Sequence, residues 1–168
     1  MTNSIHAQSV LVLDHGLRAL SALLDKARIH AATAGYDVNV LCNARLFPDM
    51  LPLARQVMIA TDMAKGAAAR LAGVEVPKWD DTETTLDELQ ARIAKALAFL
   101  ASFTPQQYEG AATRIIEIKT PSRGYQFTGQ DYLVKWALPN FYFHTTTTYN
   151  LLRHNGVPVG KMDFLAIE

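Results

Sequence analysis

Apolar residues recur along much of the chain at alternating steps of three and four positions, the spacing of a helix that buries one face. The first stripe runs from Val10 to Leu24. It predicts a helix that begins near Ser4, whose hydroxyl can cap the first turn, and ends at about Ala34, before Gly35. A short further turn of helix is expected over residues 37–41.

A second stripe predicts a helix that starts near Phe47-Pro48-Asp49. Proline is tolerated in a first turn, and an early aspartate suits the positive end of the helix dipole. The stripe reaches Leu71, and Gly73 provides the stop. Alanine is abundant in this segment, which permits close approach of a neighbouring helix. The segment 74–81, which contains Pro77, is expected to be a loop.

A third helix is predicted directly after Thr85. Thr85 and Glu88 have the spacing of a capping box, in which two side chains satisfy two backbone N–H groups. The apolar stripe of this helix runs from Leu86 to Leu100, and Thr104-Pro105 ends the helix.

The helical pattern breaks between residues 113 and 127. Apolar and polar residues alternate over 116–119 and again over 125–127, on either side of a turn-like segment at 120–124. Strict alternation around a turn predicts a β-hairpin.

A fourth helix is predicted after Thr128, which can cap it. Pro139 falls inside this helix, where it lacks a backbone N–H and clashes with the carbonyl of Lys135. We therefore expect a kink just over one turn before His144. Such a kink serves helix packing or accompanies a binding site, and the sequence leaves both interpretations open.

The composition indicates a globular protein and excludes several classes of partner. The 168 residues are 49% hydrophobic and 19% charged, which fits a single domain over residues 1–168. Lys and Arg number 16, as do Asp and Glu, so we expect no nucleic acid and no membrane surface as partner. Cys42 is the lone cysteine, which excludes an intrachain disulfide and a cysteine-rich zinc site.

The chain carries no signal for a membrane or for export. No apolar run approaches the roughly 20 residues that span a bilayer. The first ten residues, MTNSIHAQSV, lack the basic start and the small-residue cleavage site of a signal peptide. A cytoplasmic location is the resulting expectation.

The main candidate for chemistry is a polar stripe on the predicted fourth helix. Asn140, His144 and Thr148 follow one another at four-residue spacing, so they share one helical face. Aromatic residues flank the stripe, among them Tyr142 and Tyr149. In such surroundings a polar stripe lines a pocket or forms a satisfied buried network. Which of the two holds decides whether the protein is an enzyme.

His144 is the strongest single candidate for a metal ligand or a pocket anchor. Two helical residues four positions apart can bind one metal ion. The partners at that spacing are Asn140 and Thr148, which are poor ligands for first-row metals. The alternative is a histidine that lines the core and is hydrogen-bonded to a neighbouring helix.

Two residues of the predicted second helix are further candidates. Asp62 lies among small apolar residues, where it is a base or acceptor facing the interior, or else a surface residue paired with Lys65. Gln56 faces the same space as His144 if the second and fourth helices are neighbours, and is otherwise an exposed glutamine. His6 shares the apolar side of the first helix, so we expect it to reach the interior.

Several distinctive segments are spread over nearly the whole chain: NARLFPDM at 43–50, ATDMAK at 60–65, ARLAG at 69–73, FTGQDY at 127–132, LPNFYFH at 138–144, LRHNGV at 152–157 and DFL at 163–165. Together they resemble one branch of uncharacterised bacterial proteins within the DinB/YfiT-like metalloenzyme superfamily. The resemblance implies an all-α fold, an up-down-down-up four-helix bundle with a small β-hairpin before the last helix.

The resemblance also implies where a metal would bind. Members of the superfamily typically hold a divalent metal with one histidine on the second helix and two histidines, four residues apart, on the fourth. They include thiol-dependent transferases and isomerases. By that resemblance the position on the second helix falls near Gln56, and the two on the fourth helix fall on Asn140 and His144, so at most one of the three ligands is kept. A bound zinc or nickel ion would need a replacement ligand such as Asp62 or His6.

Three hypotheses about function remain. The first is a protein that binds a small ligand in the former metal pocket, with Asn140 and His144 as anchors and with Asp62, Tyr142 and Tyr149 as neighbours. The alternative is a divalent-metal enzyme of thiol-transferase or hydrolase type, with His144 as ligand and Asp62 as ligand or base. The third is a homodimer without catalysis that packs through its alanine-rich second helix.

Overall fold

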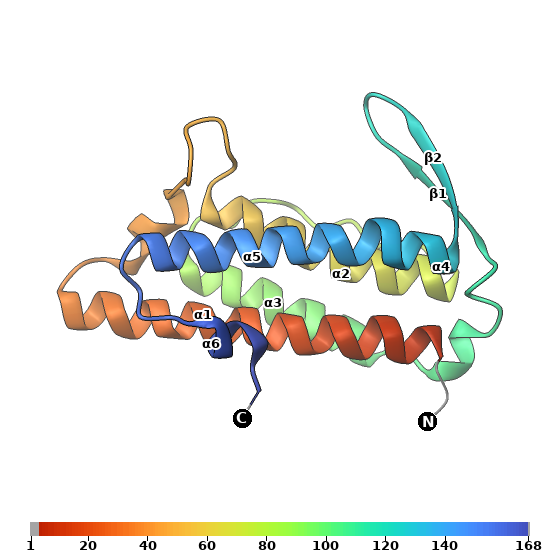
Figure 1. Cartoon of the computed structure of the whole chain (residues 1–168), viewed down its shortest axis with the longest axis horizontal. Coiled ribbons are helices and arrows are strands. Elements are labelled where there is room, and N and C mark those ends of the chain that lie inside the picture. The colour runs from red at the N-terminus through yellow and green to blue at the C-terminus, as the bar shows by residue number, and fades with distance from the viewer. Residues whose placement is uncertain (1–3, 168) are drawn as a thin grey trace.

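Four long helices lie alongside one another, and a small antiparallel hairpin projects from one end of them (Figure 1). The structure is a computed structural model that describes residues 4–167. The long helices are α1 (Val12–Ala34), α2 (Leu53–Ala72), α3 (Leu86–Ala101) and α5 (Leu138–His154), and the hairpin consists of β1 (Ile115–Lys119) and β2 (Gly124–Thr128). The shorter helical elements are η1 (Ala7–Leu11), η2 (Val38–Asn43), η3 (Pro105–Tyr108), α4 (Gly129–Tyr132), η4 (Leu133–Ala137) and α6 (Lys161–Leu165).

The long helices enclose one connected hydrophobic core. Helix α2 packs on α3 and α5, and α1 packs on the same two helices. Five alanines of α2 are fully buried within this chain, namely Ala60, Ala64, Ala67, Ala68 and Ala69. The alanine-rich face expected to form a dimer is therefore used inside the protomer, and a homodimer would have to form through another surface. No helix among residues 4–167 is long and apolar enough to cross a membrane.

Three of the predicted helix ends, each with a recognisable capping residue, agree with the structure. The Ser4 hydroxyl accepts a hydrogen bond from the Ala7 N–H at 3.2 Å. Gly35 ends α1 in the left-handed conformation, with φ of 75°. At the start of α3 the capping box of Thr85 and Glu88 is complete. Backbone N–H groups of Thr84 and Thr85 bond to Glu88 and lower the pKa of its carboxyl to about 2.

The predicted start of the second helix is wrong. Helix α2 begins at Leu53, not near Phe47, and residues 47–50 form a turn closed by a bond from the Met50 N–H to the Phe47 carbonyl. The reason is Pro52, whose ring disfavours a helical conformation at the residue before it. Pro52 itself is extended, with ψ of 165°, and the helix can start only after it.

The fourth helical segment is continuous from α4 through η4 to α5, and Pro139 is accommodated by a widened turn. Thr128 caps its start by accepting a hydrogen bond from the Asp131 N–H at 3.2 Å. The π-helical turn η4 lies immediately before Pro139, in the turn that loses a backbone donor to the proline. The side-chain amide of Asn140 donates to the Trp136 carbonyl at 2.7 Å and supplies a donor to that same turn.

The hairpin is fixed to the bundle by aromatic side chains. Ile116 pairs with Phe127, and β1 turns its two buried isoleucines to one face. Tyr125 and Phe127 of β2 both lie against the ring of Trp136, with centroids 5.0 and 5.9 Å away. The hairpin therefore docks on η4, at the end of the bundle far from the η2 turn (Figure 1).

Candidate functional site

His144 on α5 and Gln56 on α2 meet across the interface between their helices. The Nδ1 atom of His144 lies 2.7 Å from the Oε1 atom of Gln56. The Nε2 amide group of Gln56 donates in turn to the backbone carbonyl of Leu51, at 3.0 Å. Residues 88 positions apart in the sequence thus form one polar pair.

The contacts of Gln56 determine the tautomer of His144. Because the Gln56 Nε2 group is committed to the Leu51 carbonyl, its Oε1 atom faces the imidazole and can only accept a hydrogen bond. Nδ1 of His144 must then carry a proton. In the neutral ring this leaves Nε2 unprotonated, so His144 presents a fixed hydrogen-bond acceptor away from Gln56.

His144 is half-buried, and burial lowers the pKa of its imidazole below the ordinary value. The ring of Phe143 stands edge-on to the imidazole, with centroids 5.2 Å apart. Phe143 is itself 59% exposed, and Leu51 is 43% exposed. The site therefore combines a neutral acceptor with apolar side chains that reach the surface.

The lowered pKa of His144 makes stability depend on pH. The unfolded chain protonates this histidine near its ordinary pKa of about 6.5, whereas the folded chain does so at lower pH. As pH falls through that window the unfolded state binds more protons, so stability decreases. We expect the melting temperature to fall less between about pH 7 and pH 5 for His144→Gln than for the wild type. An equal fall in melting temperature in the two proteins would exclude His144 as the cause.

Asn140 and Thr148, the other members of the polar stripe, bond within their own helix. The amide of Asn140 donates to Trp136, as described above. The hydroxyl of Thr148 is fully buried and donates to the backbone carbonyl of His144 at 3.0 Å. Of the three residues in the stripe, His144 alone forms a side-chain hydrogen bond to another helix within residues 4–167.

Asp62 belongs to a different cluster from His144. Its Oδ1 atom lies 2.7 Å from the Lys65 ammonium and 2.9 Å from the Arg92 guanidinium. Arg92 comes from α3 and is 3% exposed. The interpretation of Asp62 as a partner of Lys65 is thus correct, and Arg92 is a second partner that the sequence pattern did not indicate.

Arg92 is the centre of an ion-pair cluster that holds the linker 73–85. Its Nη1 group donates to Glu83 at 2.9 Å and to the Asp80 carbonyl at 2.9 Å. Its Nη2 group reaches Asp81 at 3.0 Å as well as Asp62, and its Nε donates to Thr61. The side chain thereby joins α2, α3 and the linker. We call this group the Arg92 cluster.

Comparison with known proteins gives the family. Residues 5–165 match the family model described as a domain of unknown function, DUF1993. The chain belongs to the DUF1993 family. Among solved structures, this DUF1993 domain is similar to a crystal structure of a DinB family member protein from Shewanella denitrificans. The two are 44% identical with a TM-score of 0.90, over 98% of this chain and 93% of that one. The search of curated proteins found no match.

The residues of this DUF1993 domain do not fit the metal site of the wider superfamily. Among residues 4–167, no three His, Cys, Asp or Glu side chains are grouped so that they could hold a metal ion. At the three expected positions, Gln56 is bonded to the Nδ1 atom of His144, and Asn140 is turned to its own helix. At these positions only Nε2 of His144 remains as a possible nitrogen ligand. A single imidazole is too few ligands for zinc or nickel.

His6, the other suggested replacement ligand, lies elsewhere in the DUF1993 fold. Its ring stands edge-on to Tyr108, with centroids 5.1 Å apart. Its Nε2 atom is buried and has no hydrogen-bond partner among residues 4–167. It reaches the interior, as expected, and its contact is with an aromatic ring of the η3 segment.

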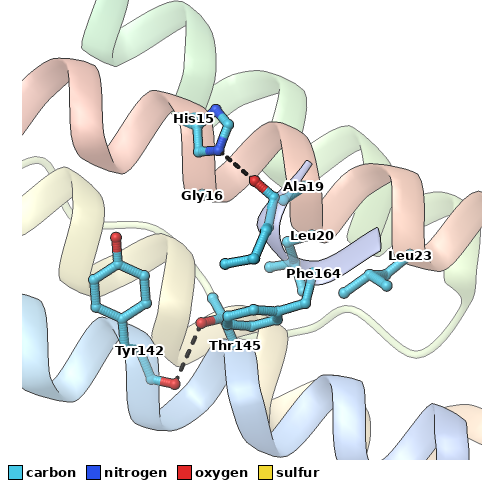
Figure 2. A pocket seen from close by; sticks show the side chains of 9 residues that line it. His15, Gly16, Ala19, Leu20, Leu23, Tyr142, Thr145 and Phe164 are labelled. Atoms are coloured by element: carbon cyan, nitrogen blue, oxygen red, sulfur yellow. Dashed lines mark hydrogen bonds between the residues drawn. The ribbon is translucent and has the colours of Figure 1, made fainter. Parts of the chain in front are cut away.

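Tyr142 and Tyr149 lie toward the C-terminal helix α6 of the DUF1993 domain. Tyr149 stands edge-on to Phe164, with centroids 5.9 Å apart. Tyr142 lines a cavity of about 70 Å³ between α1, α5 and α6, together with His15 and Phe164 (Figure 2). Sequence reasoning missed this cavity, because its walls come from three helices and α6 had not been predicted.

Proposed function

We propose that this chain binds a small ligand through His144 and does so without a metal. The bond between Gln56 and His144 carries the proposal, because it fixes an imidazole with Nε2 as a free acceptor beside exposed apolar side chains. The ligand is a small molecule with a hydroxyl, thiol or amine donor for Nε2 and an apolar part for Phe143.

The fold that carries this site is, in our proposal, a single DinB-type domain with up-down-down-up helix order. The length of the linker 73–85 supports it. Helix α2 has 20 residues and is about 30 Å long. A dozen extended linker residues span about 40 Å, which is enough to return along the bundle and start α3 in the same direction as α2.

The metal-enzyme alternative receives no support from the position of Asp62. That hypothesis needs Asp62 as a ligand or base beside His144. The Asp62 carboxylate is instead bonded to Lys65 and Arg92. This carboxylate is therefore a member of the Arg92 cluster, and His144 is bonded to Gln56 instead.

Two measurements test the proposal. Metal analysis of the purified protein is expected to find far less than one zinc or nickel ion per chain. Nitrogen-15 NMR of the histidines, titrated with benzyl alcohol as probe, is expected to shift the Nε2 signal of His144. Matched His144→Phe and Gln56→Leu variants should lose or weaken the response. Stoichiometric metal that disappears in His144→Ala would overturn the proposal, as would an unchanged Nε2 signal.

A further inference from the structure

A second candidate site lies on the other side of α5. Tyr142 and His144 are two positions apart, so their side chains point about 200° apart around the helix. Tyr142 lines the cavity together with residues of α1 (Figure 2), while His144 is bonded to Gln56 of α2. The cavity beside Tyr142 is therefore separate from the His144–Gln56 pair.

We propose that this cavity binds a compact, neutral, mostly apolar molecule with one hydroxyl or carbonyl group, such as a short-chain alcohol. We further propose that α6 is its lid. The proposal does not depend on the function proposed for His144, because the two sites share no side chain.

The walls of the cavity determine this ligand class. Ala19, Leu20, Leu23 and Phe164 make most of the lining apolar, and no Asp, Glu, Lys or Arg side chain lines it. A charged ligand would therefore lose its hydration without gaining a partner. Since an apolar cavity of about 150 Å³ holds benzene, about 70 Å³ suits roughly three to five non-hydrogen atoms.

One end of the cavity can form hydrogen bonds. Tyr142 is 40% exposed, and within residues 4–167 its hydroxyl makes no hydrogen bond. Partial burial raises the pKa of this hydroxyl. It can both donate to a ligand and accept from it. Thr145 donates its own hydroxyl to the Tyr142 carbonyl at 3.3 Å, so its oxygen can still accept.

Helix α6 covers the cavity through a few contacts that can open. Phe164 and Leu165 form its inner surface, yet no residue of this five-residue helix is fully buried. It is held by a hydrogen bond from His15 Nε2 to the Leu165 carbonyl, at 2.8 Å, and by an ion pair between Lys26 and Asp163. Segments with so little burial open at low free-energy cost, which gives a ligand a way in.

Two probes test the site in the full chain by amide NMR, namely xenon for the apolar end and 2-propanol for both ends. Both are expected to shift amides of α1 near Ala19, of α5 near Tyr142, and of α6. In Tyr142→Phe, 2-propanol should bind about two- to tenfold more weakly, because one hydrogen bond is lost. Xenon binding should be unchanged in the same variant.

A matched pair of α1 variants separates cavity binding from a non-specific solvent effect. Ala19 is 3% exposed and lines the cavity, so Ala19→Leu should abolish the response to both probes. Ala32 is exposed on the same helix, so Ala32→Leu should leave both responses intact. If Ala19→Leu does not fold, Ala19→Val fills part of the space and should weaken both.

Three outcomes would overturn the proposal. The first is a response to the probes that survives Ala19→Leu or Ala19→Val. The second is a set of shifts that lies away from α1, α5 and α6. The third is equal weakening of xenon and 2-propanol in Tyr142→Phe, because the hydroxyl would then have no specific role.

Discussion

Replacing Arg92 by alanine is expected to lower the free energy of unfolding by about 3 kcal/mol or more. The side chain is 2% exposed and bonds to three carboxylates, a carbonyl and a hydroxyl. Its removal leaves Glu83, which is 16% exposed, without its cation. Breaking a buried ion pair from one side is costly because the remaining charge stays desolvated. Thermal melts should show a loss of about 6–12 °C for a chain of this length.

An exposed arginine provides the control for this substitution. Arg18 pairs with Asp14 on the surface of α1 and is 65% exposed. Arg18→Ala should therefore leave the melting temperature close to that of the wild type, because water screens an exposed ion pair. Arg92→Lys should also be destabilising, since a single ammonium cannot reproduce the forked bonds of a guanidinium. If Arg92→Ala proves as mild as Arg18→Ala, the Arg92 cluster does not hold the fold together.

A local measurement distinguishes loss of the linker from general loss of stability. Lys78 is exposed and lies in the linker 73–85 that the Arg92 cluster holds. In Arg92→Ala, trypsin should cut after Lys78 well below the melting temperature, because the released linker can enter the protease. Cleavage there at the wild-type rate would show that other contacts, such as those of Trp79, hold the linker.

The sequence predicted those features of the fold that depend on local chemistry. The capping box of Thr85, the stop at Gly35 and the alternation of the hairpin each involve residues within a few positions of one another. The predicted start of α2 was wrong because either of two prolines could mark it. The prediction placed Pro48 in the first turn, whereas Pro52 is the residue directly before the helix.

The candidate site depended on helix rotation and on distant segments, which a local pattern does not determine. Gln56 meets His144 because α2 and α5 are neighbours with these faces opposed. Asp62, six positions later, points about 120° away from Gln56 and so meets α3 instead. Arg92 was missed because a lone arginine on an amphipathic helix normally occupies a solvent-exposed position. The acidic residues of 80–83 were the available signal for a buried cation.

The second large effect is expected at Gly129, the first residue of α4. A Cβ atom there would overlap the backbone carbonyl of Ala111 and lie 3.3 Å from a methyl group of Leu71. The backbone cannot yield easily, because the Gln130 N–H is bonded to the Ala112 carbonyl at 3.0 Å. Gly129→Ala should therefore cost about 3 kcal/mol, the upper part of the range for overpacking, with the α4–hairpin junction displaced.

Gly66→Ala is the matched control for Gly129→Ala, because the same methyl group then meets a movable neighbour. Gly66 lies inside α2, where a Cβ atom would press only on the guanidinium of Arg70. That side chain can swing away at the loss of one hydrogen bond to Tyr132, while alanine gains about 1 kcal/mol of helix propensity over glycine. Gly66→Ala should thus stay within about 1 kcal/mol of the wild type in denaturant unfolding. Equal losses in the two variants would mean that buried glycines act here through general crowding, and that the contact between α4 and Ala111 is not a specific constraint on the fold.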